Sequence, residues 1–372
     1  MKKIIVVSAV NLTEGGPLTV LQKCLGYLSA NLSDEYEIIA LVNRKDLLPF
    51  ENIKYLEFPK SKKSWFNRLY YEYYYFDKLA KRLNPFLWLS LHDITPKVTA
   101  ERQAVYCHNA SPFYRSSFHT FQLEPKFFLF TLFYKYLYSI NIHRNMFVIV
   151  QQDWMRKEFV NRFGLGNVIV AHPESNGYFE AISLTKSDLF TFIYPAFPRF
   201  FKNFEIICSA AEQLYLKGVP DFKIILTING SESRYSHLIY NKFKHVPVLS
   251  FTGLQPRNKI LEYYSISDCL IFPSKLETWG LPISEFKKYD KPILLANLPY
   301  AHETVGDYNK VKFFSPDNVG ELAGAMEALM SGDLTFDATN TENIEPPYAE
   351  NWEQLFDILL SVQPPAVSVT SN

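Results

Sequence analysis

The sequence predicts an α/β protein with two domains, each built around a parallel sheet. The chain has 372 residues, which is more than a single hydrophobic core usually holds. Short apolar runs recur along it and end in polar turns, as the strands of parallel sheets do. Residues 172–189 lose this periodicity, so we place the boundary between the domains there.

The first domain is expected to cover residues 1–175. Its apolar runs predict strands at residues 3–10, 36–42, 53–58, 86–91, 104–107, 147–150 and 167–170. Helices are predicted at residues 17–30, 60–83, 126–138 and 153–163. The apolar run at the N-terminus leads into a Gly-rich turn without a small-residue cleavage pattern. We therefore interpret it as a first strand and not as a signal peptide.

The second domain is expected to cover residues 190–345. Its strands are predicted at residues 191–195, 223–226, 248–252, 269–272, 292–296 and 312–314. One helix should follow residue 202 and run to about residue 216, another should begin between residues 280 and 282, and a third should cover residues 317–330. A last helix is expected within residues 350–362, followed by a disordered tail at residues 363–372.

The chain is organised around residues 267–290, SDCLIFPSKLETWGLPISEFKKYD. A strand, a loop and a helix starting near Pro282 would leave backbone N–H groups free to bind an anion. Glu277 and Glu285 flank this point. Carboxylates repel phosphate but accept hydrogen bonds from hydroxyls, so the pattern suits a nucleoside diphosphate sugar. Either glutamate alone has an equally good structural explanation, as a solvated or helix-favouring residue.

The pattern P-S-x-x-E-x-W-G-L-P-x-x-E at residues 273–285 resembles the signature of family 4 glycosyltransferases, whose two glutamates have seven residues between them. This resemblance is clear in the second domain and limited to strand ends in the first. It implies the GT-B fold, with two Rossmann-like domains facing a cleft and a C-terminal helix that crosses back to the first domain. It also implies that Glu277 is catalytic and that the donor contacts Glu285 and the loop residues Thr278, Trp279, Gly280 and Leu281.

Two cations follow the first strand of the second domain. Arg199 and Lys202 precede a helix start, where the helix dipole disfavours positive charge, so an anion should compensate them. The resemblance implies that both are catalytic and stabilise the departing diphosphate. We therefore expect no metal ion and no other cofactor. The glycine usual in this loop is replaced by Pro195 or Ala196.

Further candidate donor residues lie where other strands end. Asn229 and Gly253-Leu254 follow two strands of the second domain. Gly15 and Gly16 follow the first strand of the chain, where glycine lets a ligand approach the backbone closely. The family often carries a Gly-Gly pair there, facing the donor phosphate and the acceptor. The G-x-G-x-x-G spacing is absent, which disfavours a nicotinamide dehydrogenase.

Two histidines follow strands of the first domain. His92 and Asp93 follow the strand at residues 86–91, and His108 follows the strand at residues 104–107. Ligands of parallel sheets bind beyond such strand ends, although a histidine there is as often structural. The resemblance implies that His108 is catalytic and lies near the donor sugar. His92 and Asp93 are candidates for binding the acceptor.

The formal net charge is zero, but residues 1–180 hold 22 Lys and Arg against 16 Asp and Glu. Residues 60–83 mix basic and aromatic side chains, and residues 126–138 are apolar on most sides. Each segment can be an ordinary helix packed on the sheet. Together they favour peripheral contact with an anionic membrane surface. No run reaches about 18 apolar residues, so no membrane span is predicted.

Four cysteines without metal-ligand spacing indicate small buried side chains in a reducing compartment. We therefore expect a cytoplasmic protein, peripheral on the inner face of the cell membrane. The expected reaction moves a hexose, with retention, from a UDP-, GDP- or dTDP-sugar to a glycan or lipid-linked saccharide. Such an acceptor, for example one linked to undecaprenyl diphosphate, belongs to lipopolysaccharide O-antigen, capsule or exopolysaccharide biosynthesis. No nucleic acid is expected as a partner.

Two alternatives of other classes remain open. A nucleotide-sugar 2-epimerase on the same fold would act on the donor alone. A non-catalytic nucleotide-sugar-binding subunit would bind the donor without transfer, but four charged residues, Arg199, Lys202, Glu277 and Glu285, argue against it.

Overall fold

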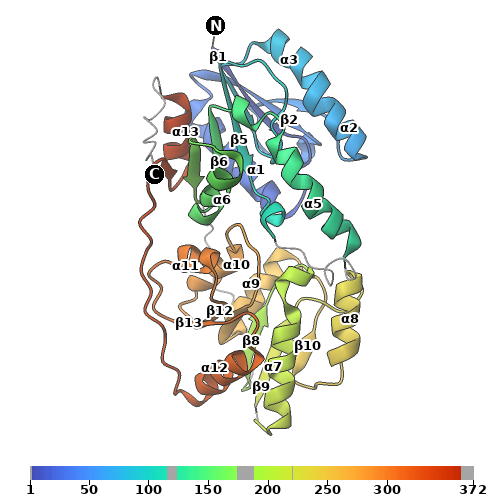
Figure 1. The fold of residues 1–372 in the computed structure, drawn as a ribbon, viewed down its shortest axis with the longest axis vertical. Helices are drawn as coiled ribbons and strands as arrows, with labels where there is room; N and C mark the ends of the chain where they lie inside the picture. Colours follow the sequence, from blue (N-terminus) through green and yellow to red (C-terminus); the bar gives the residue numbers. More distant parts are fainter. Residues whose placement is uncertain (1, 115–123, 174–187, 220, 362–372) are drawn as a thin grey trace. The chain divides into compact units, whose positions relative to one another are not determined.

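The computed structural model describes residues 2–114, 124–173, 188–219 and 221–361. The chain divides into two compact units. The first unit consists of residues 1–113, 131–174 and 344–372, and the second of residues 114–130 and 175–343. Each unit is an α/β structure with its own sheet (Figure 1). The tail that we expected to be disordered, residues 363–372, lies outside the described residues.

The described residues of the first unit form a parallel sheet of eight strands in the order β14-β7-β6-β5-β4-β1-β2-β3. The strands are β1 (Lys3–Ala9), β2 (Tyr36–Val42), β3 (Lys54–Glu57), β4 (Leu87–Ser90), β5 (Arg102–Cys107), β6 (Phe147–Val150), β7 (Val168–Ala171) and β14 (Tyr348–Ala349). Strand order reverses between β1 and β4, which makes their junction the switch point of the sheet.

Helices cover both faces of this sheet. They are α1 (Gly15–Tyr27), α2 (Trp65–Tyr70), α3 (Phe76–Leu83), α5 (Pro125–Ser139), α6 (Asp153–Phe163) and α13 (Trp352–Leu360). Because side chains alternate along a strand, Ile5 and Val7 of β1 pack in a core with α1 and α13, whereas Val6 packs in a second core with α3.

The C-terminal helix α13 does return to the first unit, as the resemblance implied. Leu355, Phe356 and Leu359 are buried in the core that contains β1 and α1. The ring of Phe356 stacks on Tyr27 of α1, with the centroids 5.6 Å apart. Burying side chains of this size is worth about 2 kcal/mol each, which is enough to hold a short helix in place.

Two expectations for the first unit were wrong. The helix predicted from residue 60 begins only at Trp65, because the Ser64 side chain caps it by accepting a hydrogen bond from the Asn67 N–H (3.2 Å). It then has three parts, since a π-helical turn (Tyr71–Tyr75) separates α2 from α3. The set of seven predicted strands was also incomplete, because β14 pairs with β7 and extends the sheet. Two residues are too short to show a strand pattern in the sequence.

The second unit has six described strands, again all parallel, in the order β10-β9-β8-β11-β12-β13. The strands are β8 (Phe190–Tyr194), β9 (Phe222–Leu226), β10 (Leu249–Phe251), β11 (Cys269–Phe272), β12 (Ile293–Ala296) and β13 (Val311–Phe314). The helices are α7 (Phe204–Leu216), α8 (Arg234–Phe243), α9 (Arg257–Ile266), α10 (Leu281–Lys287), α11 (Pro299–Val305) and α12 (Val319–Ser331). The switch point lies between β8 and β11.

The four cysteines are buried and free, in agreement with the sequence interpretation. Burial raises the pKa of each thiol well above its usual range, so all four are held as neutral apolar side chains.

Candidate functional site

The loops after β8 and β11 leave the switch point of the second unit at the carboxyl edge of the sheet, where ligands of open parallel sheets bind. The loop after β8 carries Arg199 and Lys202, and the loop after β11 carries Glu277. Asn203 adopts a left-handed conformation (φ 59°) between Lys202 and α7, and its side chain donates to the Pro273 carbonyl at 3.3 Å. This contact ties the two loops together.

Lys202 and Glu277 form a direct ion pair from Nζ to Oε1. Their side chains are 18% and 12% exposed, so the pair is largely shielded from water. The backbone carbonyl of Lys202 also accepts a hydrogen bond from the buried Tyr194 hydroxyl at 2.8 Å. The sequence predicted both charges at this edge, and the structure brings them into contact.

Arg199 has a different partner. Its Nη1 lies 3.4 Å from Oε2 of Glu124, a residue that the sequence analysis did not single out. Oε1 of Glu124 is buried and has no hydrogen-bond partner among the described residues. The Arg199 side chain is about half-exposed and also covers the Phe197 ring at 5.2 Å. The cation is therefore accessible to a ligand from solvent.

Glu285 is the second glutamate of the motif and projects from α10, where it is buried. Its Oε1 accepts a hydrogen bond from Arg257 Nη1 at 2.8 Å, and its Oε2 accepts one from the Tyr264 hydroxyl at 3.3 Å. Arg257 was missed in the sequence. A detectable signal existed, because a cation in the first turn of a helix (here α9) opposes the helix dipole, as at Arg199 and Lys202.

The loop of the central motif is fixed by its backbone and by Trp279. Gly280 has φ +82°, and a Cβ there would lie 2.9 Å from Ile283 Cδ1, so the turn requires glycine. The indole N–H of Trp279 donates to Ser284 Oγ at 2.9 Å, and its carbonyl accepts from the Thr304 hydroxyl. Thr278 and Leu281, on either side of this turn, are partly buried.

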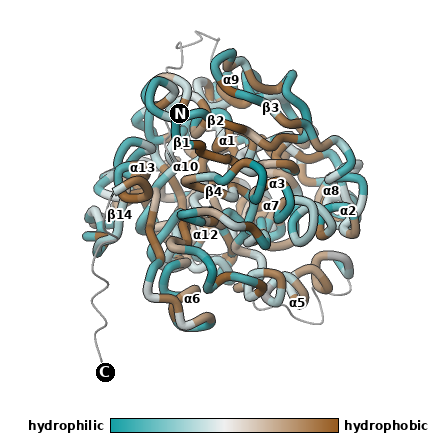
Figure 2. The backbone as a smooth tube through the Cα atoms, turned by 90° about the horizontal axis from the view of Figure 1, so that it is seen from above, coloured by the Kyte–Doolittle hydropathy of each residue, from teal (hydrophilic) through white to brown (hydrophobic). Residues whose placement is uncertain are grey.

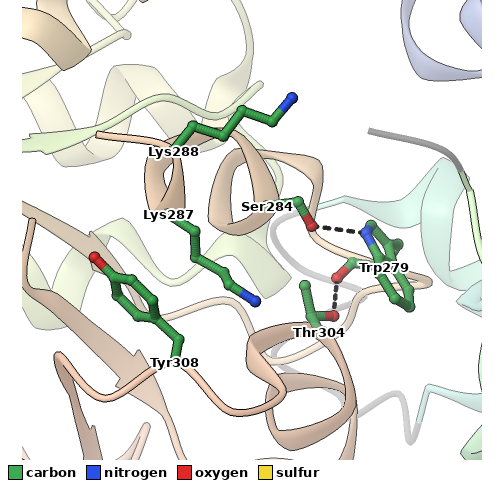
Figure 3. Close-up of a pocket in the computed structure, with 6 residues that line it drawn as sticks. All are labelled: Trp279, Ser284, Lys287, Lys288, Thr304 and Tyr308. Atoms are coloured by element: carbon green, nitrogen blue, oxygen red, sulfur yellow. Dashed lines mark hydrogen bonds between the residues drawn. The ribbon is translucent and has the colours of Figure 1, made fainter. Parts of the chain in front are cut away.

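Trp279 also lines a pocket of about 370 Å³ together with side chains of α10, α11 and the segment that follows α11 (Figure 3). The lining residues are Trp279, Ser284, Lys287, Lys288, Thr304 and Tyr308. Burial lowers the pKa of Lys287, whose ammonium donates to the Val305 carbonyl.

The strand-end residues after β9 and β10 also meet. Gly253 has φ +73°, and a Cβ there would come within 2.8 Å of Asn229 Nδ2, so glycine allows the two turns to approach. The Asn229 backbone N–H donates to Glu232 at 2.8 Å, and Leu254 beside Gly253 is exposed. Asn229, Gly253 and Leu254 thus lie on adjacent loops of the same sheet edge.

In the first unit, His92 lies in a buried polar cluster at the switch point between β1 and β4. Its Nε2 is 3.0 Å from Ser8 Oγ, and its carbonyl accepts a hydrogen bond from Arg68 at 2.7 Å. Glu72 Oε1 lies 3.3 Å from His92 Nδ1. Burial lowers the pKa of His92 well below its usual value and raises the pKa of Glu72 to about 8. His92 is fully buried, so it presents no atom at the surface.

Asp93 has a positive φ (70°) and uses its carboxylate to organise neighbouring loops. Its Oδ1 accepts from the backbone N–H groups of His108 (2.6 Å) and Asn109 (3.1 Å) and from the Tyr138 hydroxyl (3.1 Å). Its Oδ2 accepts from the Tyr134 hydroxyl at 3.2 Å. Asp93 was a candidate for binding the saccharide acceptor. In the structure its carboxylate instead accepts hydrogen bonds from four groups of the protein itself.

His108 is held by the same part of the first unit. Its Nε2 donates to the Leu91 carbonyl at 2.6 Å, which leaves Nδ1 as the acceptor nitrogen. Burial lowers the pKa of the ring, so it is neutral near pH 7. Gly15 and Gly16 form the start of α1 after β1, and Gly15 has φ +65°.

Among the described residues, no group of three or more His, Cys, Asp and Glu side chains is arranged to hold a metal ion. No helix in the described ranges is both long and apolar enough to cross a membrane.

Comparison with known proteins agrees with this architecture. Residues 179–344 match the family model described as Glycosyl transferases group 1. The second unit therefore carries a glycosyl transferase domain, and the chain is a glycosyltransferase. No curated protein sequence gives a significant match.

Solved structures match nearly the whole chain at low identity. A glycosyltransferase from Rickettsia africae ESF-5 has a TM-score of 0.64 and 17% identity, covering 90% of this chain and 89% of its own. HepE from Anabaena, in complex with UDP, has a TM-score of 0.61 and 16% identity, with coverages of 89% and 90%. The lipopolysaccharide outer core galactosyltransferase WaaB has a TM-score of 0.61 and 14% identity, with coverages of 90% and 92%. The fold is GT-B.

Proposed function

We propose that this glycosyltransferase binds a nucleotide sugar at the switch point of its second unit and transfers a hexose with retention. The observation that carries the proposal is the shielded Lys202–Glu277 pair. The ammonium would bind the donor diphosphate, and the carboxylate would accept hydrogen bonds from the hexose hydroxyls. As the nucleoside diphosphate leaves, charge grows on its outer phosphate, and a cation already in place stabilises that charge. At about 4 Å such an interaction is worth about 4 kcal/mol at an effective dielectric of 20.

The other charged pairs support the same proposal. Arg199 is half-exposed and would add a second cation to the diphosphate site. Glu285 would accept hydrogen bonds from the ribose hydroxyls, in an orientation that Arg257 and Tyr264 fix. Two cations at the leaving group would supply the electrostatic stabilisation that a metal ion supplies elsewhere, so we propose metal-independent transfer. Chelator treatment should leave the rate unchanged.

The donor and acceptor classes rest on the fold neighbours. HepE has been solved with UDP and with UDP-glucose, and WaaB is a lipopolysaccharide galactosyltransferase. We propose a UDP-, GDP- or dTDP-hexose as donor and a glycan or lipid-linked saccharide as acceptor, in bacterial surface polysaccharide synthesis. Such a reaction belongs in the cytoplasm, at the inner face of the cell membrane.

A thermal-shift screen against UDP-, GDP- and dTDP-sugars tests the donor. Binding to the folded state alone raises the melting temperature, by the equivalent of about 2.7 kcal/mol at a ligand concentration 100 times the dissociation constant. Stabilisation by none of these donors would contradict the proposal. Proton NMR of the first product formed then shows whether the anomeric configuration of the donor is retained.

A nucleotide-sugar 2-epimerase is the alternative on this fold. It would convert the donor in the absence of any acceptor, whereas a transferase would leave the donor sugar unchanged apart from slow hydrolysis. Incubation with donor alone therefore distinguishes the two.

A further inference from the structure

Exposed aromatic and aliphatic side chains gather on two helical segments of the first unit. On α2 and the π-helical turn, Phe66 is 86% exposed, and Tyr70 and Tyr74 are about half-exposed. On α5, Phe133 and Tyr136 are 60% and 59% exposed. Exposed apolar side chains in this number are unusual on a surface that meets only water.

The two segments are in contact. Trp65 of α2 packs edge-on against Tyr134 of α5, with the ring centroids 6.2 Å apart. We call this the aromatic surface, and it consists of Trp65, Phe66, Tyr70, Tyr74, Leu132, Phe133, Tyr136 and Ile140.

Helix α5 is apolar on two opposite sides. Thr131, Tyr134 and Tyr138 face the protein and are buried, whereas Leu132 and Tyr136 lie on the exposed side. The tube of α5 is accordingly drawn largely in brown shades (Figure 2). The inner side accounts for the packing of α5 on the first unit, whereas the outer side leaves large side chains exposed to solvent.

The charges around the aromatic surface are almost all positive. Residues 60–83 contain seven Lys and Arg, of which Arg68 is buried, against two acidic residues. Of the two acidic residues, Glu72 is buried and Asp77 is bound by Lys81 at 2.7 Å. Lys60 and Lys63, just before α2, are exposed. The surface is therefore complementary to a negatively charged partner.

We propose that the aromatic surface docks on an anionic lipid leaflet. Trp and Tyr rings favour the headgroup level of a bilayer, and Phe and Leu favour the adjoining acyl region. Lysines at the edge of such a surface bind anionic headgroups, at about 1 kcal/mol each. The proposal deepens the proposed function, because it names the surface on which a lipid-linked acceptor would be met. Lipid binding itself does not depend on the donor site.

Co-sedimentation of the full chain with vesicles tests this docking. We expect binding to vesicles of phosphatidylglycerol and phosphatidylethanolamine and weaker binding to phosphatidylcholine alone. Replacing two outward-facing rings, in Phe66→Glu/Phe133→Glu, should weaken binding at least about 100-fold, because each buried ring contributes about tenfold or more. Lys60→Glu/Lys63→Glu should remove the preference for phosphatidylglycerol and most of the salt dependence.

The matched control is Leu216→Glu, which places the same charge at a side chain of α7 in the second unit that is 78% exposed. It should bind vesicles as the wild type does. All variants should keep the wild-type melting temperature within a few degrees, since the replaced side chains are exposed.

Three outcomes would overturn the docking proposal. The wild type could ignore phosphatidylglycerol vesicles at low salt, or the double Phe variant could bind as tightly as the wild type. The aromatic surface could also mediate self-association without lipid binding, seen as dimers that the Phe variants abolish. Calorimetry with nucleotide sugars separates this proposal from the proposed function: vesicle binding that persists in a chain that binds no donor would reject only the latter.

Discussion

Both units carry polar side chains at the switch point of their sheet. These side chains are partly exposed in the second unit and fully buried in the first. At the switch point of the second unit, Lys202 and Glu277 form an ion pair whose side chains are still partly exposed. At the switch point of the first unit, His92 and Glu72 are completely buried. Burial favours the neutral form of both, since it lowers the pKa of the histidine and raises that of the carboxyl.

This difference in burial indicates that the polar residues of the second unit can bind a ligand, whereas those of the first unit stabilise its structure. An ion pair that keeps some exposure can exchange one partner for a ligand of the same charge without leaving a fully buried charge unpaired. The fully buried His92 and Glu72 cannot, because any unpaired polar group left inside the protein costs about 1–3 kcal/mol. The first unit therefore uses its strand-end histidines to fix loop geometry, whereas the second unit keeps its strand-end charges available.

The largest effect is expected for the pH dependence of the free energy of unfolding, which the buried Glu72 should cause. Glu72 holds its proton up to about pH 8 in the folded state and releases it near pH 4.5 when unfolded. At Glu72 the folded state thus binds more protons between these values, so this group should lower the free energy of unfolding by about 5 kcal/mol as pH rises through the window. The lowered pKa of His92 acts in the opposite direction below its usual value, so the effect of Glu72 is measured as the difference between the wild type and a Glu72 variant. Glu72→Gln, which stays neutral, should remove this fall. Urea denaturation at several pH values measures it, and parallel pH profiles of both proteins would contradict a protonated Glu72 in the folded state.

The next effect concerns turnover in the second unit. Lys202→Ala removes the shielded cation of the candidate donor site, and the rate should drop by about 10²–10³, as for loss of other preorganised charge stabilisers. Steady-state kinetics with the donor identified by the thermal-shift screen measures the loss. Arg199→Ala should lower the rate in the same range.

Lys217→Ala is the control for this loss of charge. Lys217 lies at the far end of α7, is half-exposed and pairs with Glu327 at 3.2 Å. Its removal should leave the rate unchanged, because exposed pairs contribute about 0–1 kcal/mol. Lys202 and Arg199 variants with rates within a few-fold of wild type would remove the cation pair from the mechanism.

The sequence predicted the parts of the fold whose signal is local. Buried parallel strands read as apolar runs, so β2, β6 and β11 begin and end at the predicted residues. Strand β14 was missed because its two residues are strand only through pairing with β7. The same limit applies to the site. Lys202 and Glu277 were found because each lies in a recognisable local pattern, whereas the contacts of Arg199 with Glu124 and of Glu285 with Arg257 are long-range.

A smaller effect on the free energy of unfolding is expected for substitutions of Asp93. Asp93→Ala removes an acceptor that serves four donors, and we expect a loss of about 2–3 kcal/mol in the free energy of unfolding. Asp93→Asn keeps the shape and one acceptor oxygen and should lose about half as much. If Asp93 instead bound an acceptor directly, both variants would raise the acceptor KM without changing the urea midpoint.

The smallest effect divides the two glutamates of the motif by role. Glu285→Ala should weaken binding of both the sugar nucleotide and the bare nucleoside diphosphate about tenfold, since one or two hydrogen bonds to the ribose are lost. Arg257→Ala should have a weaker effect in the same direction, because Arg257 donates a hydrogen bond to Glu285 and would orient its carboxylate. Glu277→Ala should lower turnover of the intact donor while the bare nucleoside diphosphate still binds. Calorimetry with nucleoside diphosphate measures the difference, and equal affinity of Glu285→Ala and wild type would show that the buried carboxylate serves only to hold α9 against α10.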